Sequence, residues 1–280
     1  MAELPLQEEL DPGLQTRLAQ LRERMRRFGA VVVAYSGGVD SSLVAAVAVE
    51  QLGEAALAVT GVSPALAPHL RREARWQAQW LGIRHQEVAT QELHVADYAN
   101  NPPERCRACK ATLHQHLARL EPVAAGAQVV DGVNQDDLGD HRPGIAAARQ
   151  RGVRSPLVDS GIGKLQVRQL SRALGLPWWD KPAQPCLSSR FPYGEPITAH
   201  GLERVAAAEA WLLAHGYRQV RVRSQGTTAR IEIPAAAVAD FLSHVDRSRL
   251  VAHFRSLGFT AVGLDLEGLV SGKLNRSLVT

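Results

Sequence analysis

The segment SGGVDSS at positions 36–42 constrains the fold more than any other part of the chain, because it joins two different kinds of structure. The β-branched run VVVAY at 31–35 precedes it and is typical of a buried parallel strand. An Ala-, Leu- and Val-rich stretch at 39–52 follows it and predicts a helix that ends at Gly53. A strand, a glycine turn and a helix in this order form the first half of a βαβ unit.

The same alternation continues along the chain and predicts an α/β fold with a doubly wound parallel sheet. Proline and glycine interrupt the pattern between 178 and 196, where we expect a loop. We therefore expect a first domain over 1–195 and a smaller C-terminal α+β domain over 196–280. Further strands are expected at 55–60, 83–88, 128–131 and 259–264, a hairpin at 219–223 and 229–233, and helices at 70–81, after Cys109, and at 165–174, 201–215 and 246–257.

The composition excludes several classes of protein. With 280 residues, 45% of them hydrophobic and 21% charged, the chain can bury a sizeable core, so it is neither disordered nor a small disulfide-stapled module. No apolar run reaches the length of a membrane span, and the acidic start lacks a signal pattern, so we expect a cytoplasmic location. The net charge of +4 suits an anionic small substrate and suits RNA only weakly.

The loop at 36–42 predicts a phosphate-binding site. Its glycines let backbone N–H groups approach an anion closely, and the following helix adds unpaired donors and a partial positive charge. Asp40 can hold a Mg²⁺ ion that bridges phosphates. The alternative is an ordinary glycine turn with serine caps. A Walker A loop is excluded because the segment has no lysine. The candidate nucleotide-binding residues here are Ser36, Gly37, Gly38, Val39, Asp40, Ser41 and Ser42.

A second polar segment, DGVNQDD, begins at Asp131 directly after a predicted strand. Ligands bind at the carboxyl edge of open α/β sheets, so Asp131 and Gly132 are candidate nucleotide-binding residues. The same segment continues to Arg142, a candidate for binding an anionic substrate. The alternative is an Asp/Asn-rich turn with helix caps. The spacing does not fit an EF-hand loop, because Val133 stands at its third position.

Three cysteines are placed as if for chemistry. Cys186 lies in a proline-stiffened loop between Lys181 and Arg190, and nearby cations favour the nucleophilic thiolate. Cys106 and Cys109 form a C-x-x-C pair that can be a redox pair, half of a metal site or a coincidence. Three thiolates with one open position would suit a [4Fe–4S] cluster.

The C-terminal part offers a second set of cations. Arg221 and Arg223 alternate with valines, so a strand would place both guanidinium groups on one face, able to bind phosphate or carboxylate. The alternative is a solvated strand face. Glu232 and Asp240 are candidates for an acidic, metal-binding pair near them.

Several motifs together resemble one family, the LarE-type ATP-dependent sulfur transferases of nickel-pincer cofactor biosynthesis. The resemblance spans nearly the whole chain. Its most specific part is CLSSRFPYG, which begins at Cys186, and the glycine loop alone resembles the wider ATP pyrophosphatase (PP-loop) superfamily. The motifs are SGGVDSS from 36, DGVNQDD from 131, SPL from 155, WDKPAQPCLSSRFPYG from 179 and LDLEG from 264.

The resemblance implies an activity and its cofactors. The family uses ATP to adenylate the carboxylates of a pyridinium-3,5-dicarboxylate mononucleotide and converts them to thiocarboxylates. One subtype takes the sulfur from a single cysteine matching Cys186, which becomes dehydroalanine, whereas another carries three cysteines and a [4Fe–4S] cluster. Cys106 and Cys109 make this chain similar to the second. The family also commonly forms homohexamers through its C-terminal domain.

The resemblance also suggests residue roles. The loop would hold the pyrophosphate and Mg²⁺, with Thr60 near the adenosine. Lys164, Lys181 and Arg190 are the candidates for offsetting charge at the α-phosphorus. Cys186, or a cluster that it ligates, would deliver sulfur, while Arg221 and Arg223 would bind the substrate phosphate.

Three other functions stay open at this point. A PP-loop tRNA thiolase would need an RNA-binding module, yet only 5% of the residues are aromatic and no such module is recognisable. An amide-forming ligase related to NAD synthetase would need no reactive cysteine. A nucleotide-binding module without catalytic activity would not convert ATP to AMP.

Overall fold

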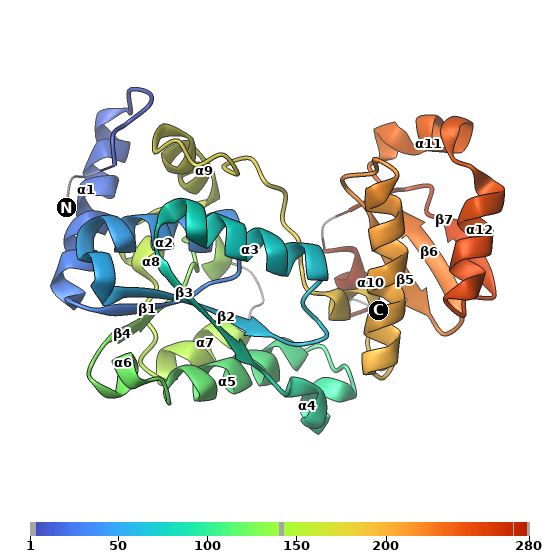
Figure 1. The fold of residues 1–280 in the computed structure, drawn as a ribbon, viewed down its shortest axis with the longest axis horizontal. Coiled ribbons are helices and arrows are strands. Elements are labelled where there is room, and N and C mark those ends of the chain that lie inside the picture. Colours follow the sequence, from blue (N-terminus) through green and yellow to red (C-terminus); the bar gives the residue numbers. More distant parts are fainter. Residues whose placement is uncertain (1–3, 140–142, 271, 279–280) are drawn as a thin grey trace. The chain divides into compact units, whose positions relative to one another are not determined.

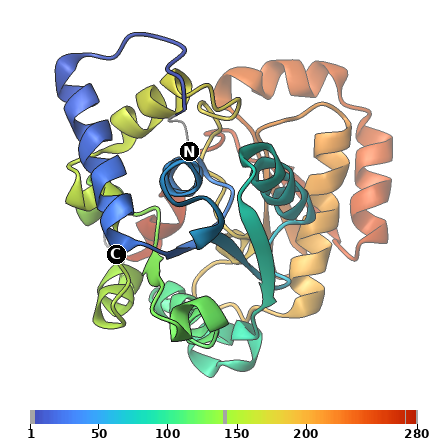
Figure 2. The same ribbon diagram turned by 60° about the vertical axis from the view of Figure 1, so that its left-hand side comes forward.

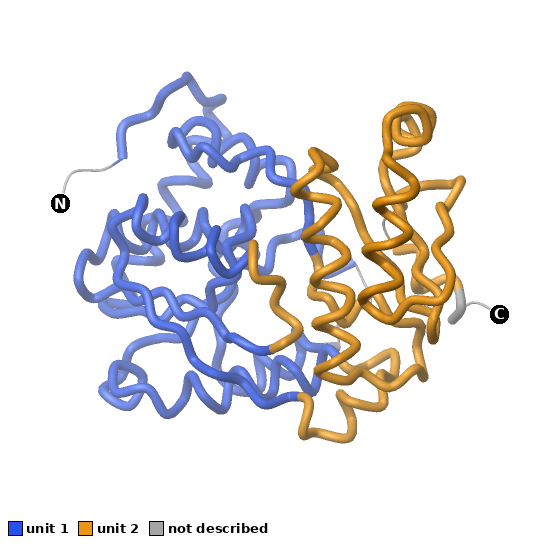
Figure 3. The backbone as a smooth tube through the Cα atoms, turned by 45° about the vertical axis from the view of Figure 1, so that its right-hand side comes forward, with its two compact units in different colours: residues 1–63, 70–92, 106–184 blue, residues 64–69, 93–105, 185–280 orange. Residues whose placement is uncertain are grey.

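The computed structural model describes residues 4–139, 143–270 and 272–278, and the chain divides into two compact units (Figure 3). The first unit comprises residues 1–63, 70–92 and 106–184, and the second comprises 64–69, 93–105 and 185–280. The second unit thus begins before the boundary expected at 196 and also takes in two short segments from the first 105 residues.

The first unit is built on a four-stranded sheet with the strand order β3-β2-β1-β4 (Figure 1). All neighbouring strands are parallel, with Val31 opposite both Ala56 and Gln128. The strands are β1 (Val31–Ala34), β2 (Ala56–Val62), β3 (Arg84–Ala89) and β4 (Gln128–Val130). The helices are α1 (Pro12–Phe28), α2 (Val39–Leu52), α3 (Pro68–Leu81), α5 (Arg105–Leu117), α6 (Glu121–Ala124), α7 (Pro143–Gln150), α8 (Pro156–Asp159) and α9 (Lys164–Ala173), with 3₁₀ turns η1 (Gly53–Ala55), η2 (Glu92–His94) and η3 (Asp136–Leu138).

Helices cover both faces of this sheet (Figure 2). Val31 and Val33 pack with α1, α2, α3 and α9 on one face, and Val32 packs with α5 and α7 on the other. A parallel strand that is buried on both faces needs apolar residues at every position, which explains the unbroken valine run. The doubly wound parallel sheet predicted from the sequence is therefore confirmed.

Local signals set the limits of the first helix. The Asp11 carboxylate accepts a hydrogen bond from Leu14 N at 2.9 Å, and Pro12 occupies the first helical position. Gly29 ends the helix with a positive φ of 70°. Between these caps, Leu14, Leu18, Leu21 and Met25 face the core. The helix thereby supports the strand that leads to the glycine loop.

The strand order places the polar motifs at one edge of the sheet. In a parallel sheet all carboxyl ends meet at the same edge, and β1 lies between β2 and β4. The loop at 36–42 follows β1, Asp131 follows β4, and Thr60 lies near the end of β2. The expectation that these segments share an edge is therefore met.

The second unit contains a three-stranded sheet of order β5-β6-β7, flanked by helices. β5 and β6 form the predicted antiparallel hairpin, and β7 runs parallel to β6. Leu202, Leu212, Val222, Ile231 and Phe254 are buried in this unit. Its elements are α4 (Ala96–Ala99), η4 (Leu187–Arg190), α10 (Ala199–Ala214), β5 (Arg221–Gln225), β6 (Thr228–Glu232), η5 (Ala235–Ala237), α11 (Val238–His244), α12 (Arg247–Ser256), β7 (Ala261–Leu264) and η6 (Lys273–Leu278).

Some predicted boundaries were wrong. The helix expected after Cys109 begins at Arg105, so Cys106 and Cys109 lie within α5. The expected loop over 178–196 contains the 3₁₀ turn η4. The short helices α4, α6, α7, α8 and α11 were not predicted, because segments of four to eight residues hold too few turns for a helical period to show. Among the described residues, no helix is both long and apolar enough to cross a membrane.

Candidate functional site

The loop at 36–42 has the geometry of an anion-binding turn. Gly37 takes a positive φ of 68°. Ser41 Oγ donates to Gly38 O at 3.1 Å, and Ser36 Oγ accepts from Gly38 N at 3.3 Å, so the hydroxyls brace the turn. Gly38 is the N-cap of α2 and, as a glycine, has no side chain that could bond to the first N–H groups of that helix. These donors are therefore available to an anion.

Two lysines reach this loop from later parts of the chain. Lys181 Nζ donates to Gly37 O at 3.0 Å and pairs with Glu73 of α3 at 2.5 Å. Lys164, the first residue of α9, forms an ion pair with Asp40. Both candidate cations thus lie beside the glycine turn, more than 120 residues away from it in sequence.

Asp40, the candidate magnesium ligand, is held from two sides. Lys164 contacts Oδ2, and Asn134 Nδ2 donates to Oδ1 at 3.0 Å. Asn134 comes from the DGVNQDD segment, which the sequence placed at this edge. Asp136 of the same segment accepts from Lys164 N at 2.7 Å and fixes the start of α9. The segment therefore orders the groups around Asp40.

Asp131 and Gly132 support the loop from β4. Asp131 is 8% exposed and accepts from Ser155 Oγ at 2.8 Å and from Val133 N at 3.2 Å. Burial raises the pKa of Asp131 above its ordinary value, and the hydrogen bond from Ser155 partly opposes this shift. A Cβ added to Gly132 would lie 2.6 Å from Ser41 N, so only glycine lets β4 approach the first turn of α2 this closely.

Thr60 and Ser42 are buried beside the loop. Thr60 Oγ1 donates to Tyr35 O at 2.9 Å and contacts His85 Nε2 at 2.9 Å. Burial lowers the pKa of His85. Ser42 is fully buried, and its hydroxyl donates to Gln77 Oε1 at 3.2 Å. Thr60 thus holds the backbone at Tyr35, whereas Ser42 bonds to the side chain of Gln77. Contact of Thr60 or Ser42 with a nucleotide stays a prediction.

The three cysteines are divided between the two units. Cys106 and Cys109 lie one turn apart on α5, and Cys186 lies in the second unit. Leu113 of α5 would be 3.0 Å from a Cβ on Gly61, so this helix packs at the carboxyl end of β2. Cys106 and Cys186 are exposed. Within the described residues, no group of three or more His, Cys, Asp and Glu side chains is arranged to hold a metal ion.

Arg190 fixes the loop that carries Cys186. Its guanidinium forms two bonds of 2.8 and 3.0 Å to the buried Glu209. Another nitrogen donates to Pro185 O at 2.8 Å and to Cys186 O at 3.3 Å. Glu209 therefore balances the charge that was expected to act at the α-phosphorus, and the visible role of Arg190 is to position the backbone at Cys186.

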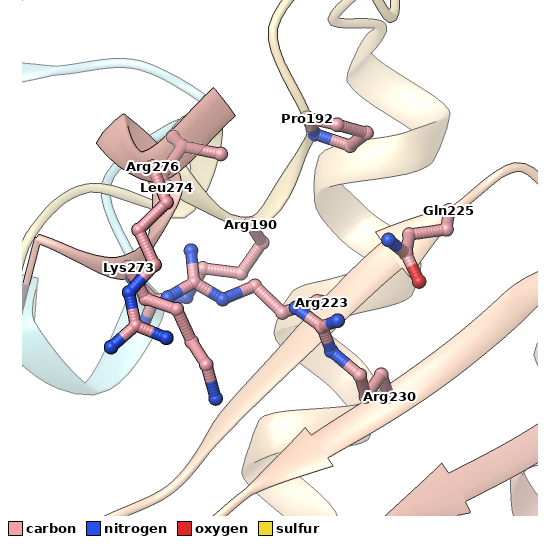
Figure 4. Close-up of a pocket in the computed structure, with 8 residues that line it drawn as sticks. All are labelled: Arg190, Pro192, Arg223, Gln225, Arg230, Lys273, Leu274 and Arg276. Carbon is pink, nitrogen blue, oxygen red and sulfur yellow. The ribbon is translucent and has the colours of Figure 1, made fainter. Parts of the chain in front are cut away.

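The second unit contains a cationic cavity of about 330 Å³ (Figure 4). It is lined by eight residues, of which five are cations and none is acidic: Arg190, Pro192, Arg223, Gln225, Arg230, Lys273, Leu274 and Arg276. Three carboxylates outside the lining set form ion pairs with these cations. Glu232 bonds to Arg223 at 2.9 Å, Asp265 to Lys273 at 2.7 Å, and Glu267 to Arg276 at 2.7 Å.

The cavity accounts for only part of the predicted C-terminal set. Arg223 lines it, but Arg221 is not among the lining residues, and burial lowers the pKa of Arg221. The expected acidic pair is not formed, because Glu232 is fully buried between Arg223 and Arg230, whereas Asp240 is exposed and pairs with His244. Arg142 lies outside the described residues.

Four residues near these sites were not predicted from the sequence: Arg230, Lys273, Arg276 and Gln77. Arg230 carried a signal, because it faces Arg223 across a two-residue hairpin turn. Gln77 also carried one, since it follows Ala74 by one turn on the inward face of α3. Lys273 and Arg276 carried none, because only the tertiary fold brings the C-terminal segment to the cavity.

Comparisons with known proteins give relatives over nearly the whole chain. Residues 17–113 match the family model described as asparagine synthase, a stretch that includes the glycine loop. The chain is 53% identical over 265 residues to an uncharacterised protein of Synechocystis sp., covering 95% of this chain and 99% of the relative. It is 36% identical over 266 residues to pyridinium-3,5-bisthiocarboxylic acid mononucleotide synthase of Lactiplantibacillus plantarum, covering 95% and 96%. It is 27% identical over 239 residues to an uncharacterised protein of Methanocaldococcus jannaschii, covering 85% and 89%.

Proposed function

Since this chain belongs to the LarE-type family of ATP-dependent sulfur transferases, we propose that it adenylates the carboxylates of a pyridinium-3,5-dicarboxylate mononucleotide and converts them to thiocarboxylates. The observation that carries the proposal is the glycine loop with Lys164 and Lys181 beside it, in a chain that also presents the exposed thiol of Cys186. Activating a carboxylate with ATP and then displacing AMP with a sulfur nucleophile would need these groups.

ATP would bind with its β- and γ-phosphates on the turn at Gly37 and Gly38. The free N–H groups at the start of α2 would donate to the phosphates, and Lys181 would add charge from Gly37. Asp40 would ligate Mg²⁺ in exchange for its ion pair with Lys164, which frees Lys164 for a phosphate oxygen. This exchange would leave the Asp40 carboxylate for Mg²⁺ and the Lys164 ammonium for a phosphate oxygen of ATP.

Adenylation would use this arrangement. A carboxylate oxygen of the substrate would attack the α-phosphorus and displace pyrophosphate, whose charge a Mg²⁺ ion held by Asp40 would help to offset. Negative charge would grow on the departing phosphates, and Lys181 beside Gly37 together with Lys164, once it has left Asp40, would offset it. The product is a mixed anhydride between the substrate carboxyl group and AMP.

Sulfur transfer would use the thiol of Cys186. Its thiolate attacks the acyl carbon and expels AMP, which gives a thioester. Loss of the Cα proton and cleavage of the Cβ–Sγ bond then release the thiocarboxylate and leave dehydroalanine at position 186. Arg190 would keep the thiol in place through Pro185 O and Cys186 O.

A [4Fe–4S] cluster is the second source of sulfur that we propose. The donor set fits in part, because Cys106 and Cys109 share one turn of α5. With Cys186 they would supply three thiolates, and the cluster would provide an open iron site for a hydrosulfide. Sulfur would then pass to the substrate without consuming the protein.

The cationic cavity would bind the substrate phosphate. A phosphomonoester carries up to two negative charges and three acceptor oxygens, which Arg223, Arg230, Lys273 and Arg276 could engage from the lining of one open cavity. Because carboxylates already pair with these cations, a phosphate would have to compete with the carboxylates. This competition would keep binding weak enough for the product to be released. Arg221 and Arg142 stay candidates for other anionic groups of the substrate.

The assembly and location are also proposals. The family resemblance favours a homohexamer through the C-terminal unit, where Leu242 and Val251 are large exposed hydrophobic residues. We propose a cytoplasmic homo-oligomer acting on a small molecule and not on nucleic acid. Light scattering coupled to gel filtration tests the assembly, and a monomer at micromolar concentration would contradict it.

Intact mass before and after anaerobic turnover tests the function. Thiolated product with AMP and pyrophosphate is expected. A protein mass loss of about 34 Da, the mass of H₂S, would identify Cys186 as the sulfur source. An unchanged mass, together with iron that is lost on replacing Cys106 and Cys109 with Ser, would identify the cluster. Full turnover by Cys186→Ala would instead contradict the proposal and favour amide formation.

A further inference from the structure

Three buried polar side chains form a cluster directly beneath the glycine loop: Tyr35 from the end of β1, Ser42 from α2 and Gln77 from α3. Their side chains are at most 3% exposed. None of the chemistry described above uses Gln77. Buried polar groups are normally retained for a hydrogen-bonding role, so the cluster requires an explanation.

Two hydrogen bonds of the cluster meet at one atom, and a third contact of 3.3 Å joins the hydroxyls of Tyr35 and Ser42. Gln77 Oε1 accepts from the Tyr35 hydroxyl at 3.0 Å and from the Ser42 hydroxyl at 3.2 Å. Burial raises the pKa of Tyr35 to about 12, so this hydroxyl remains a donor at physiological pH. The amide oxygen of Gln77 is thus the shared acceptor for one residue before the loop and one residue after it.

The loop backbone also rests on this part of α3. A Cβ added to Gly37 would lie 3.1 Å from Ala74 Cα and 3.2 Å from Gln77 Oε1. Glu73, one turn before Gln77, holds Lys181, which in turn bonds to Gly37 O. The inward face of α3 therefore fixes both the position of the turn and the lysine beside it.

We propose that Gln77 is a positioning residue for the β- and γ-phosphates of ATP, and that it must be neutral to serve in this role. Its oxygen holds Tyr35 and Ser42, and thereby the two ends of the glycine turn, in the conformation that presents N–H groups to the anion. A glutamate would offer the same acceptor and nearly the same shape. It would, however, place a negative charge under a site built for phosphates. The inference depends on ATP binding at the loop and not on which acid is thiolated.

Gln77→Glu separates charge from shape, and Gln79→Glu is the matched control, because Gln79 is exposed on the same helix. Calorimetric affinities are measured for ATP and for AMP, which lacks the outer phosphates, at pH 6 to 9. We expect Gln77→Glu to weaken ATP binding at least tenfold at high pH, to affect AMP less than threefold, and to recover as the new carboxyl is protonated. One unit charge a few ångströms from an anion supports an effect of about this size.

Equal losses for ATP and AMP, or an unchanged ATP affinity, would overturn the proposal. If Gln77→Glu does not fold, Gln77→Met keeps the volume but removes the acceptor. Its ATP affinity should then fall more than its AMP affinity. The absence of that difference would also contradict the proposal. These measurements need no pyridinium substrate. The positioning role of Gln77 can therefore be refuted while the sulfur-transfer function is supported, and the reverse is also possible.

Discussion

Replacing Gly132 with alanine tests the close contact between β4 and the glycine loop. The added Cβ would lie 2.6 Å from Ser41 N, 2.9 Å from Ser41 Cα and 3.0 Å from the carbonyl carbon of Asp40. All three are backbone atoms, so no side chain can rotate away. The closest contact is roughly 1 Å shorter than the optimal separation of non-bonded heavy atoms, about 3.5 Å.

Two consequences follow from this displacement. Overpacking of this kind costs about 1–3 kcal/mol in the free energy of unfolding. Because the shift falls on Asp40 and Ser41, the loop should also misplace ATP, and a displacement of about 1 Å can lower turnover about a hundredfold. The loss of activity should therefore exceed what the fraction of unfolded protein explains.

Urea denaturation and AMP formation measure these two effects on the same protein. Gly139→Ala is the matched control, since its nearest neighbour would be Asp136 O at an ordinary 3.6 Å. The control should keep wild-type stability and turnover. If Gly132→Ala kept both within twofold, the inferred contact between β4 and the loop would be wrong.

Three further predictions test other parts of the structure. Burial lowers the pKa of His114 to about 4, so between pH 6.5 and 4 the unfolded chain binds a proton that the folded chain does not. The free energy of unfolding should therefore fall by up to ~3 kcal/mol from pH 6.5 to pH 4. Denaturation curves of His114→Leu should lack this fall, and a variant with the pH dependence of the wild type would refute the prediction. Glu209→Gln leaves the buried Arg190 charge unbalanced and should cost about 3–5 kcal/mol in urea denaturation, whereas a loss below 1 kcal/mol would contradict the pairing. Lys273→Gln with Arg276→Gln should raise the KM for the phosphorylated substrate at least tenfold and leave ATP affinity unchanged, and an unchanged substrate KM would exclude the cavity as the phosphate site.

The first unit could be predicted well from the sequence, because its signals are local. The valine run, the glycine turn and the apolar helix at 39–52 specify a strand, a loop and a helix without distant contacts. Once the strands are parallel, their carboxyl ends must share an edge, so Asp131 was expected near the loop. The structure adds the close contact at Gly132, which depends on tertiary packing.

The partners of charged side chains could not be predicted in the same way. Lys164 and Lys181 were expected to be cations near the nucleotide, but nothing local shows that they contact Asp40 and Gly37. Arg190 was expected to act on phosphate, and nothing local shows that it pairs with Glu209 of α10. An ion pair between distant segments forms only when the fold brings them together. Considering each charged residue alone in the sequence therefore overestimates how many charges have no partner.

The central claim is that a carboxylate of the substrate attacks the α-phosphorus of ATP. A sulfur nucleophile then attacks the acyl carbon of the resulting mixed anhydride and displaces AMP. Substrate labelled with ¹⁸O in its carboxylates tests this claim most directly. AMP isolated after turnover should carry one heavy oxygen, while the pyrophosphate carries none. AMP without label, or ADP as the nucleotide product, would show that the carboxylate is not activated in this way.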